Sequence, residues 1–229
     1  MAELLSGLDS RGGGGRGGQV RLKLFLSLLW VCAKEPYEVA RPARAWAALL
    51  GLEDIDTRGA RRIHAAIRDL EERGLIRTRE QGGKPTVLSP LSERGNGRKY
   101  MPPPEMHNRL VQKGASERQL RPHRYFRVPS GLWTAGHIAK LTGPGLAMLL
   151  VVRCEQRGNN NSPVWFSPQR ATERYGLAES TRVQGLKQLR ELGLMITKTR
   201  PVSESGAFID QIRRRNVHTL DLSELELDE

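Results

Sequence analysis

Hydrophobic and polar positions along the chain predict three helices followed by two strands. Residues 20–34 are almost wholly apolar over a helix length, which predicts a buried helix. A short Ala-rich helix is expected over 42–50, and a third helix, capped by Asp56 or Thr57, is expected to end at Arg73. Strands over 75–80 and 85–89 then enclose a Gly-Gly turn. The first folded segment therefore spans residues 20–90.

The same order of elements recurs in residues 128–222. Helices are expected over 143–157, from Ser167 to Tyr175, and from Glu179 or Ser180 to Leu192, with strands over 194–200 and 208–222. A shift of 119 residues places Ile67, Leu70, Gly74 and Leu75 of the first segment on Leu186, Leu189, Gly193 and Leu194 of the second. The chain therefore holds two copies of one unit.

Three further segments differ from these units in composition. Residues 1–19 include the stretch RGGGGRGG and are expected to form a disordered Gly-rich tail that serves as a tether. Residues 91–127 hold nine Lys or Arg against three acidic residues, together with consecutive prolines, which predicts a basic linker with a short helix around 105–113. Residues 223–229 are expected to form an acidic tail.

The net charge of +12 favours a polyanionic partner, either nucleic acid or an anionic membrane surface. Arg outnumbers Lys by 29 to 8. Arg binds phosphate and guanine in a bidentate manner, although a GC-rich genome also enriches Arg. The longest apolar run, 24–33, is too short to span a membrane, and the N-terminal residues lack the pattern of a secretory signal. We therefore expect no membrane partner and a cytoplasmic, nucleoid-associated protein.

In sequence, the two units resemble the winged helix-turn-helix family. The resemblance rests on TRGARRI at 57–63 with Gly74-Leu75-Ile76, and on STRVQGL at 180–186 with Gly193-Leu194-Met195. It implies a mainly α fold with small β-hairpins (α+β), in which a basic linker joins two winged helix-turn-helix domains. Among tandem forms, the chain is most similar to bacterial plasmid and phage replication initiators and transcription regulators. The resemblance implies double-stranded DNA as the partner.

In such domains the third helix enters the major groove. On the third helix of the first unit, the face opposite Ile63, Ile67 and Leu70 offers hydrogen-bond donors. The candidate DNA-binding residues there are Arg58, Arg61, Arg62 and Arg68. An exposed helix face that is charged only for solubility is the alternative.

The third helix of the second unit offers both amide and cationic side chains. We expect Val183, Leu186 and Leu189 to be buried, so that the opposite face reads bases, with Gln suited to adenine. The candidate residues there are Ser180, Thr181, Arg182, Gln184, Lys187 and Gln188.

The second hairpin is strongly basic. Strand alternation is expected to place Arg213 and Arg215 on one side and Arg214 on the other, with Lys198 and Arg200 on the partner strand. Lys198, Arg200, Arg213 and Arg215 are therefore candidates for phosphate or minor-groove contact. A sheet edge protected by charge is the alternative.

No motif in the chain points to catalysis. A phosphate loop, a nucleophile elbow and a zinc-binding spacing of Cys or His are all missing from the sequence. We therefore expect no enzyme activity, catalytic residue, metal or cofactor. Cys32 and Cys154 lie in apolar runs, which favours buried free thiols.

The sequence thus predicts a sequence-specific double-stranded DNA-binding protein that acts in transcription regulation or replication control, of a bacterial plasmid or phage. The alternative is a winged-helix protein-interaction module of a chromosome or plasmid maintenance complex. Leu4, Leu5 and Leu8 share a helical face, so the N-terminal peptide is either a docking site for a protein partner or a frayed start. The oligomeric state stays open.

Overall fold

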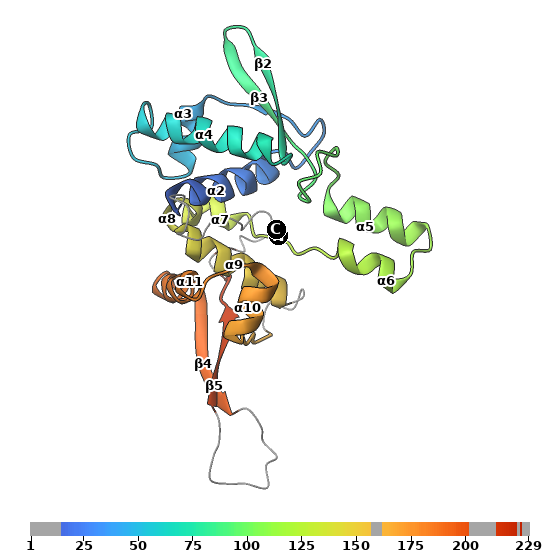
Figure 1. Ribbon diagram of the computed structural model, residues 1–229, viewed down its shortest axis with the longest axis vertical. Coiled ribbons are helices and arrows are strands. Elements are labelled where there is room, and N and C mark those ends of the chain that lie inside the picture. The colour runs from blue at the N-terminus through green and yellow to red at the C-terminus, as the bar shows by residue number, and fades with distance from the viewer. Residues whose placement is uncertain (1–14, 157–161, 202–213, 224, 226–229) are drawn as a thin grey trace.

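The computed structural model describes residues 15–156, 162–201, 214–223 and 225. The N-terminal leucines, most of the Gly-rich stretch and Arg213 therefore lie outside the described residues. Figure 1 shows an elongated molecule in which two hairpins point to opposite ends of the long axis. Helices α2 (Gly15–Val31) and α9 (Gly143–Glu155) lie between them.

The first unit contains the predicted helices and strands. After α2 come α3 (Ala43–Leu49), α4 (Arg58–Glu72), β2 (Ile76–Gln81) and β3 (Lys84–Pro90). A short strand, β1 (Val39–Ala40), pairs antiparallel with β3, so that β3 lies between β1 and β2. A strand of two residues is too short to appear in a hydrophobic pattern, and it was not predicted.

Helix α2 starts earlier and ends earlier than predicted. It begins at Gly15, so the expected tail over 1–19 includes the first turn of a helix. Gly18 is buried, and this tertiary packing overrides the low helix propensity of glycine. The helix ends at Val31 rather than at residue 34.

The second unit repeats the first. Helix α9 is followed by α10 (Pro168–Tyr175), α11 (Glu179–Glu191), β4 (Met195–Pro201) and β5 (Arg214–Leu220). Strands β4 and β5 form an antiparallel pair. Val164 forms an isolated antiparallel bridge with His218 of β5, at the place that β1 has in the first unit.

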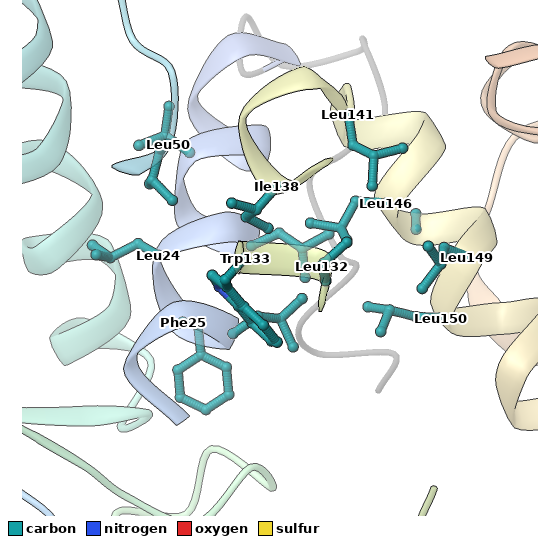
Figure 2. Close-up of a cluster of buried hydrophobic side chains, with 14 of the residues drawn as sticks. Leu24, Phe25, Leu50, Leu132, Trp133, Ile138, Leu141, Leu146, Leu149 and Leu150 are labelled. Carbon is teal, nitrogen blue, oxygen red and sulfur yellow. The ribbon is translucent and has the colours of Figure 1, made fainter. Parts of the chain in front are cut away.

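The two units share one hydrophobic core rather than two. Short helices α7 (Gly131–Thr134) and α8 (His137–Lys140) lie between α2 and α9 and fill the space between them. Figure 2 shows this cluster, with side chains from both units and from the short helices: Leu24, Phe25, Leu50, Leu132, Trp133, Ile138, Leu141, Leu146, Leu149 and Leu150. Burial of this apolar surface holds the units together.

Two specific contacts reinforce this shared core. The rings of Trp30 and Trp133 are stacked, with centroids 4.9 Å apart and planes 4° from parallel. The indole Nε1 of Trp133 donates a hydrogen bond of 2.9 Å to the Ser27 hydroxyl, which is buried in α2. Both contacts join residues about 100 positions apart, so they fix α7 on α2.

A buried lysine also bridges the units. Lys23 is 1% exposed, and its Nζ donates to the carbonyl oxygen of Leu50 at 3.3 Å and of Ala139 at 3.0 Å. The first carbonyl lies at the end of α3 and the second in α8. Burial, assisted by the positive charge of Arg62, lowers the pKa of Lys23 to about 8.

The connection between the units contains more helix than predicted. Helix α5 (Pro103–Gln112) starts with prolines, which suit a first helical turn, and α6 (Glu117–Leu120) leads into a 3-10 turn over Arg121–His123. None of the residues in these three elements is buried. Figure 1 shows α5 and α6 as an arm that projects to one side.

The chain returns to the core at its other end. Leu222 and Leu225 are buried, and the Leu225 carbonyl accepts a hydrogen bond of 3.1 Å from the amide of Gly131. The acidic tail expected over 223–229 therefore includes a core residue.

Candidate nucleic-acid interface

Helix α4 presents the face that the sequence predicts. Ile63 and Leu70 are fully buried, Ile67 is half-buried, and the residues opposite them are exposed. The exposed residues on that face are Arg58, Arg61, Ala65 and Arg68, with half-buried Arg62 at its side.

These arginines differ in what they contact. Arg58 forms an ion pair of 3.3 Å with Asp54. Hydrogen bonds from Thr57 and Arg58 hold the pKa of Asp54 below its usual value, so that this carboxylate stays charged. Arg61 and Arg68 have no carboxylate partner in the described part of the chain. Arg61 and Arg68 can therefore bind an external anion without breaking an ion pair within the described part of the protein.

Helix α11 is rotated relative to the prediction. Its buried residues are Thr181, Arg182, Gly185 and Leu189. Val183, which was expected to be buried, is 54% exposed. A Cβ on Gly185 would lie 2.3 Å from the carbonyl oxygen of Pro144, so the missing side chain allows α11 to approach α9 closely. The prediction of Thr181 and Arg182 as DNA contacts is corrected, because both side chains face the protein.

Gln188 is also turned inward. Its Oε1 accepts hydrogen bonds from the backbone amide of Thr142 at 2.9 Å and from the Thr142 hydroxyl at 2.7 Å, while its Nε2 donates to the Lys140 carbonyl at 3.3 Å. Thr142 is the N-cap residue of α9. The prediction that Gln188 reads bases is therefore wrong: its amide ties α11 to the start of α9.

The exposed face of α11 keeps three of the six predicted residues. Ser180, Gln184 and Lys187 are exposed, and they follow one another at the three- and four-residue spacing of a helix face. Lys187 forms only a loose, exposed ion pair of 3.7 Å with Glu191. Val183 and Arg190 belong to the same exposed side and were not predicted. This face combines an amide, a hydroxyl and cations around one apolar side chain.

The C-terminal hairpin has the predicted alternation. Arg200 pairs directly opposite Arg215, and Lys198 pairs opposite Val217, so Lys198, Arg200 and Arg215 share one face. Arg213 lies outside the described residues. Like charges directly opposite each other destabilise a hairpin, and no carboxylate of the described residues pairs with Lys198, Arg200, Arg214 or Arg215. An external anion would relieve this repulsion.

In the first hairpin, in contrast, one of the cations is paired with a carboxylate of the protein itself, while Arg77 and Lys84 have no such partner among the described residues. Arg79 forms an ion pair of 3.1 Å with Glu38, and the Thr78 amide and hydroxyl both donate to Glu71. Among the described residues, the two hairpins therefore differ in the ion pairing of their cations although both are antiparallel pairs.

The structure does not bring the two groups of candidates together. Figure 1 shows α4 above α2 and α11 below α9, on opposite sides of the central helix pair. Ser180, Gln184 and Lys187 belong to the same unit as the basic C-terminal hairpin, which follows α11 directly. One group of candidate residues thus lies in the second unit and another in the first.

The thiols of Cys32 and Cys154 and the imidazole of His218, which could react or bind a metal, are buried or half-buried rather than exposed on these surfaces. Cys32 is buried, with its pKa raised to about 11 by burial, and Cys154 is half-buried. Burial, together with the charges of Arg190 and Arg182, lowers the pKa of His218. Within the described residues, no group of three or more His, Cys, Asp or Glu side chains lies close enough to hold a metal ion. None of the described helices is long and apolar enough to cross a membrane.

One exposed aromatic residue beside the C-terminal hairpin was not predicted to belong to a functional surface. Trp165 is 45% exposed, and the guanidinium of Arg215 lies over its ring, 5.0 Å from the centroid. The residue belongs to an irregular stretch, where no periodicity assigns a face.

The chain matches no model of a known protein family, no curated protein and no solved structure.

Proposed function

We propose that this protein binds double-stranded DNA sequence-specifically through two winged helix-turn-helix units and acts in transcription regulation or replication control, of a bacterial plasmid or phage. The observation that carries the proposal is the second unit, where an exposed helix face is followed directly by a hairpin whose described cations have no carboxylate partner among the described residues. The order of helix, short strand or bridge, two helices and hairpin, present in both units, supports the winged-helix assignment.

The exposed face of α11 suits the major groove. Gln184 can bond the N6 and N7 edge of adenine in a bidentate manner, and Lys187 can donate to guanine or phosphate. Val183 offers an apolar contact of the kind that recognises a thymine methyl group. This combination distinguishes base pairs, which a purely cationic face does not.

The C-terminal hairpin suits the phosphate backbone. Lys198, Arg200 and Arg215 carry charge without a carboxylate partner among the described residues, so phosphate contact replaces water and counterions rather than an internal ion pair. In this proposal, the helix supplies sequence preference and the hairpin supplies affinity and orientation.

The first unit favours a second candidate function. Glu38 pairs with Arg79 of its hairpin, Glu71 accepts a hydrogen bond from Thr78, and Glu71 and Glu72 are exposed at the end of α4. These acidic groups weaken attraction to phosphate. Contact with a protein partner, as in a chromosome or plasmid maintenance complex, is therefore the alternative for this unit.

The test measures binding of the full chain to a selected duplex and to a scrambled duplex of the same composition. Gln184→Ala should reduce discrimination between the two duplexes by about 1–3 kcal/mol, the value of one good bidentate contact. Gln188→Ala is the matched control: the same side chain is removed from the same helix, but from its inward face. That variant should melt at a lower temperature and keep the discrimination.

Wild-type binding should also weaken steeply as salt concentration rises, because phosphate contacts release counterions. A protein that binds neither duplex, or whose affinity hardly depends on salt, would contradict the proposal. Equal loss on both duplexes for Gln184→Ala would show that α11 does not read bases.

A further inference from the structure

The exposed face of the C-terminal hairpin carries an aromatic ring among its cations. Trp165 follows Val164, which bridges His218, so extended backbone turns the Trp165 side chain to the opposite face from His218. Arg215 also lies on that opposite face, because residues alternate along β5. The guanidinium of Arg215 over the Trp165 ring, 5.0 Å from its centroid, agrees with this placement.

This face, which we call the indole face, combines a stacking surface with positive charge. It consists of Trp165, Ile196, Lys198, Arg200 and Arg215. Trp165 is 45% and Ile196 is 47% exposed. The Trp165 ring is thus exposed to water beside cations that have no carboxylate partner among the described residues. This combination suits a ligand that has both a flat aromatic group and a negative charge.

We infer that the indole face binds unpaired nucleotides, with a nucleobase stacked on Trp165 and the adjacent phosphates held by Lys198, Arg200 and Arg215. This inference rests on the proposed function in that both take nucleic acid as the ligand. Bases in a closed duplex are stacked on one another, so their faces do not reach an external ring. An unpaired base exposes its face, and every base has one, so such binding tolerates any sequence.

The position of Trp165 argues against a wedge that enters a closed duplex. Intercalating side chains protrude between base steps and kink the DNA. Trp165 lies beside the base of the hairpin rather than at its tip, because its neighbour Val164 bridges His218, two residues before the end of β5. A ring on the side of a sheet provides a platform rather than a wedge. The same hairpin would thus serve duplex phosphates with its cations and melted strands with its indole.

The test uses the full chain with a short oligothymidylate, an oligouridylate and the selected duplex. Of the four tryptophans, Trp46 and Trp133 are buried, Trp30 is half-buried and Trp165 is exposed. Stacking on Trp165 should therefore quench part of the protein fluorescence when the oligothymidylate binds. Trp165→Ala should abolish this quenching and weaken oligothymidylate binding about fivefold or more, whereas Trp165→Phe should retain part of the affinity.

Val111→Ala is the matched control, since it removes a similarly exposed apolar side chain, 50% exposed, from α5 rather than from the indole face, and removes no ring. It should leave oligothymidylate affinity within about twofold of wild type, and Trp165→Ala should likewise leave duplex affinity nearly unchanged. A preference between the thymidylate and the uridylate identifies DNA or RNA as the source of the unpaired strand.

Oligothymidylate binding that is equally strong in wild type and Trp165→Ala, or that causes no quenching, would overturn the inference while duplex binding still supports the proposed function. Loss of duplex binding alone, with quenching by the oligothymidylate retained, would overturn the proposed function and support the indole face as a single-strand site.

Discussion

Lys23 allows the energetics of the shared core to be measured. Its ammonium group is buried between the two units and contacts only two described carbonyl groups by hydrogen bond. The pKa falls from 10.5 in the unfolded chain to about 8 in the folded protein. Between these values the unfolded state binds more protons than the folded state, so the free energy of unfolding rises with pH.

The expected magnitude follows from the shift. One pKa unit corresponds to about 1.36 kcal/mol, so the Lys23 contribution should add roughly 2–3 kcal/mol to the free energy of unfolding between pH 7 and pH 10. Below pH 8 both states carry the proton and the folded state bears the full penalty of burying a charge. Above pH 10.5 both states are neutral and the penalty is absent.

Lys23→Met removes this titration while it keeps the length of the side chain. The difference in unfolding free energy, wild type minus variant, should therefore grow by roughly 2–3 kcal/mol from pH 7 to pH 10. Titrations of other groups are common to both proteins and cancel in the difference. Urea unfolding of both proteins at a series of pH values measures it, and Lys34→Met, at an exposed position, is the control that should show no such change.

A difference that is the same at pH 7 and at pH 10 would refute the reasoning. It would mean that the Lys23 ammonium group is as well solvated in the folded protein as in the unfolded chain. The units would then not be closed around this side chain.

Two further predictions concern the helices that carry the candidate surfaces. Gly185→Ala should lower the free energy of unfolding by about 2–3 kcal/mol, since the new Cβ would lie 2.3 Å from the Pro144 carbonyl oxygen, whereas Gly82→Ala, with open space around it, should change the urea midpoint little. Replacing Arg61 and Arg68 together by Ala should reduce duplex affinity and its salt dependence if the first unit contacts DNA; unchanged values in a binding titration would assign that unit to a protein partner.

The outer face of α4 was predictable because its buried face is marked by large apolar side chains. Ile63, Ile67 and Leu70 recur at helical spacing, so the arginines opposite them had to face outward. The alternation of side chains along the C-terminal hairpin was predictable for a similar reason: strand alternation has a period of two and leaves only one alternative.

The outer face of α11 was not predictable from the same kind of pattern. Val183, Leu186 and Leu189 recur every three residues and indicate a buried stripe, yet Val183 is exposed. The helix packs instead through Gly185, whose small size permits a close approach but gives no hydrophobic signal. Only the contact with α9 shows which side of α11 is free.

By itself, the amino-acid sequence determined the repeated unit, the sites of its turns and the basic charge of the second hairpin. These properties depend on neighbours in the chain: helical periodicity, glycine at Gly74 and Gly193 where φ is +63° and +71°, and strand alternation. Only the tertiary structure decided that the units share a core, that Lys23 lies inside it, and that Gln188 faces inward while Trp165 faces outward. Those outcomes depend on contacts between residues far apart in the chain, such as Ser27 with Trp133, and a local pattern carries no record of them.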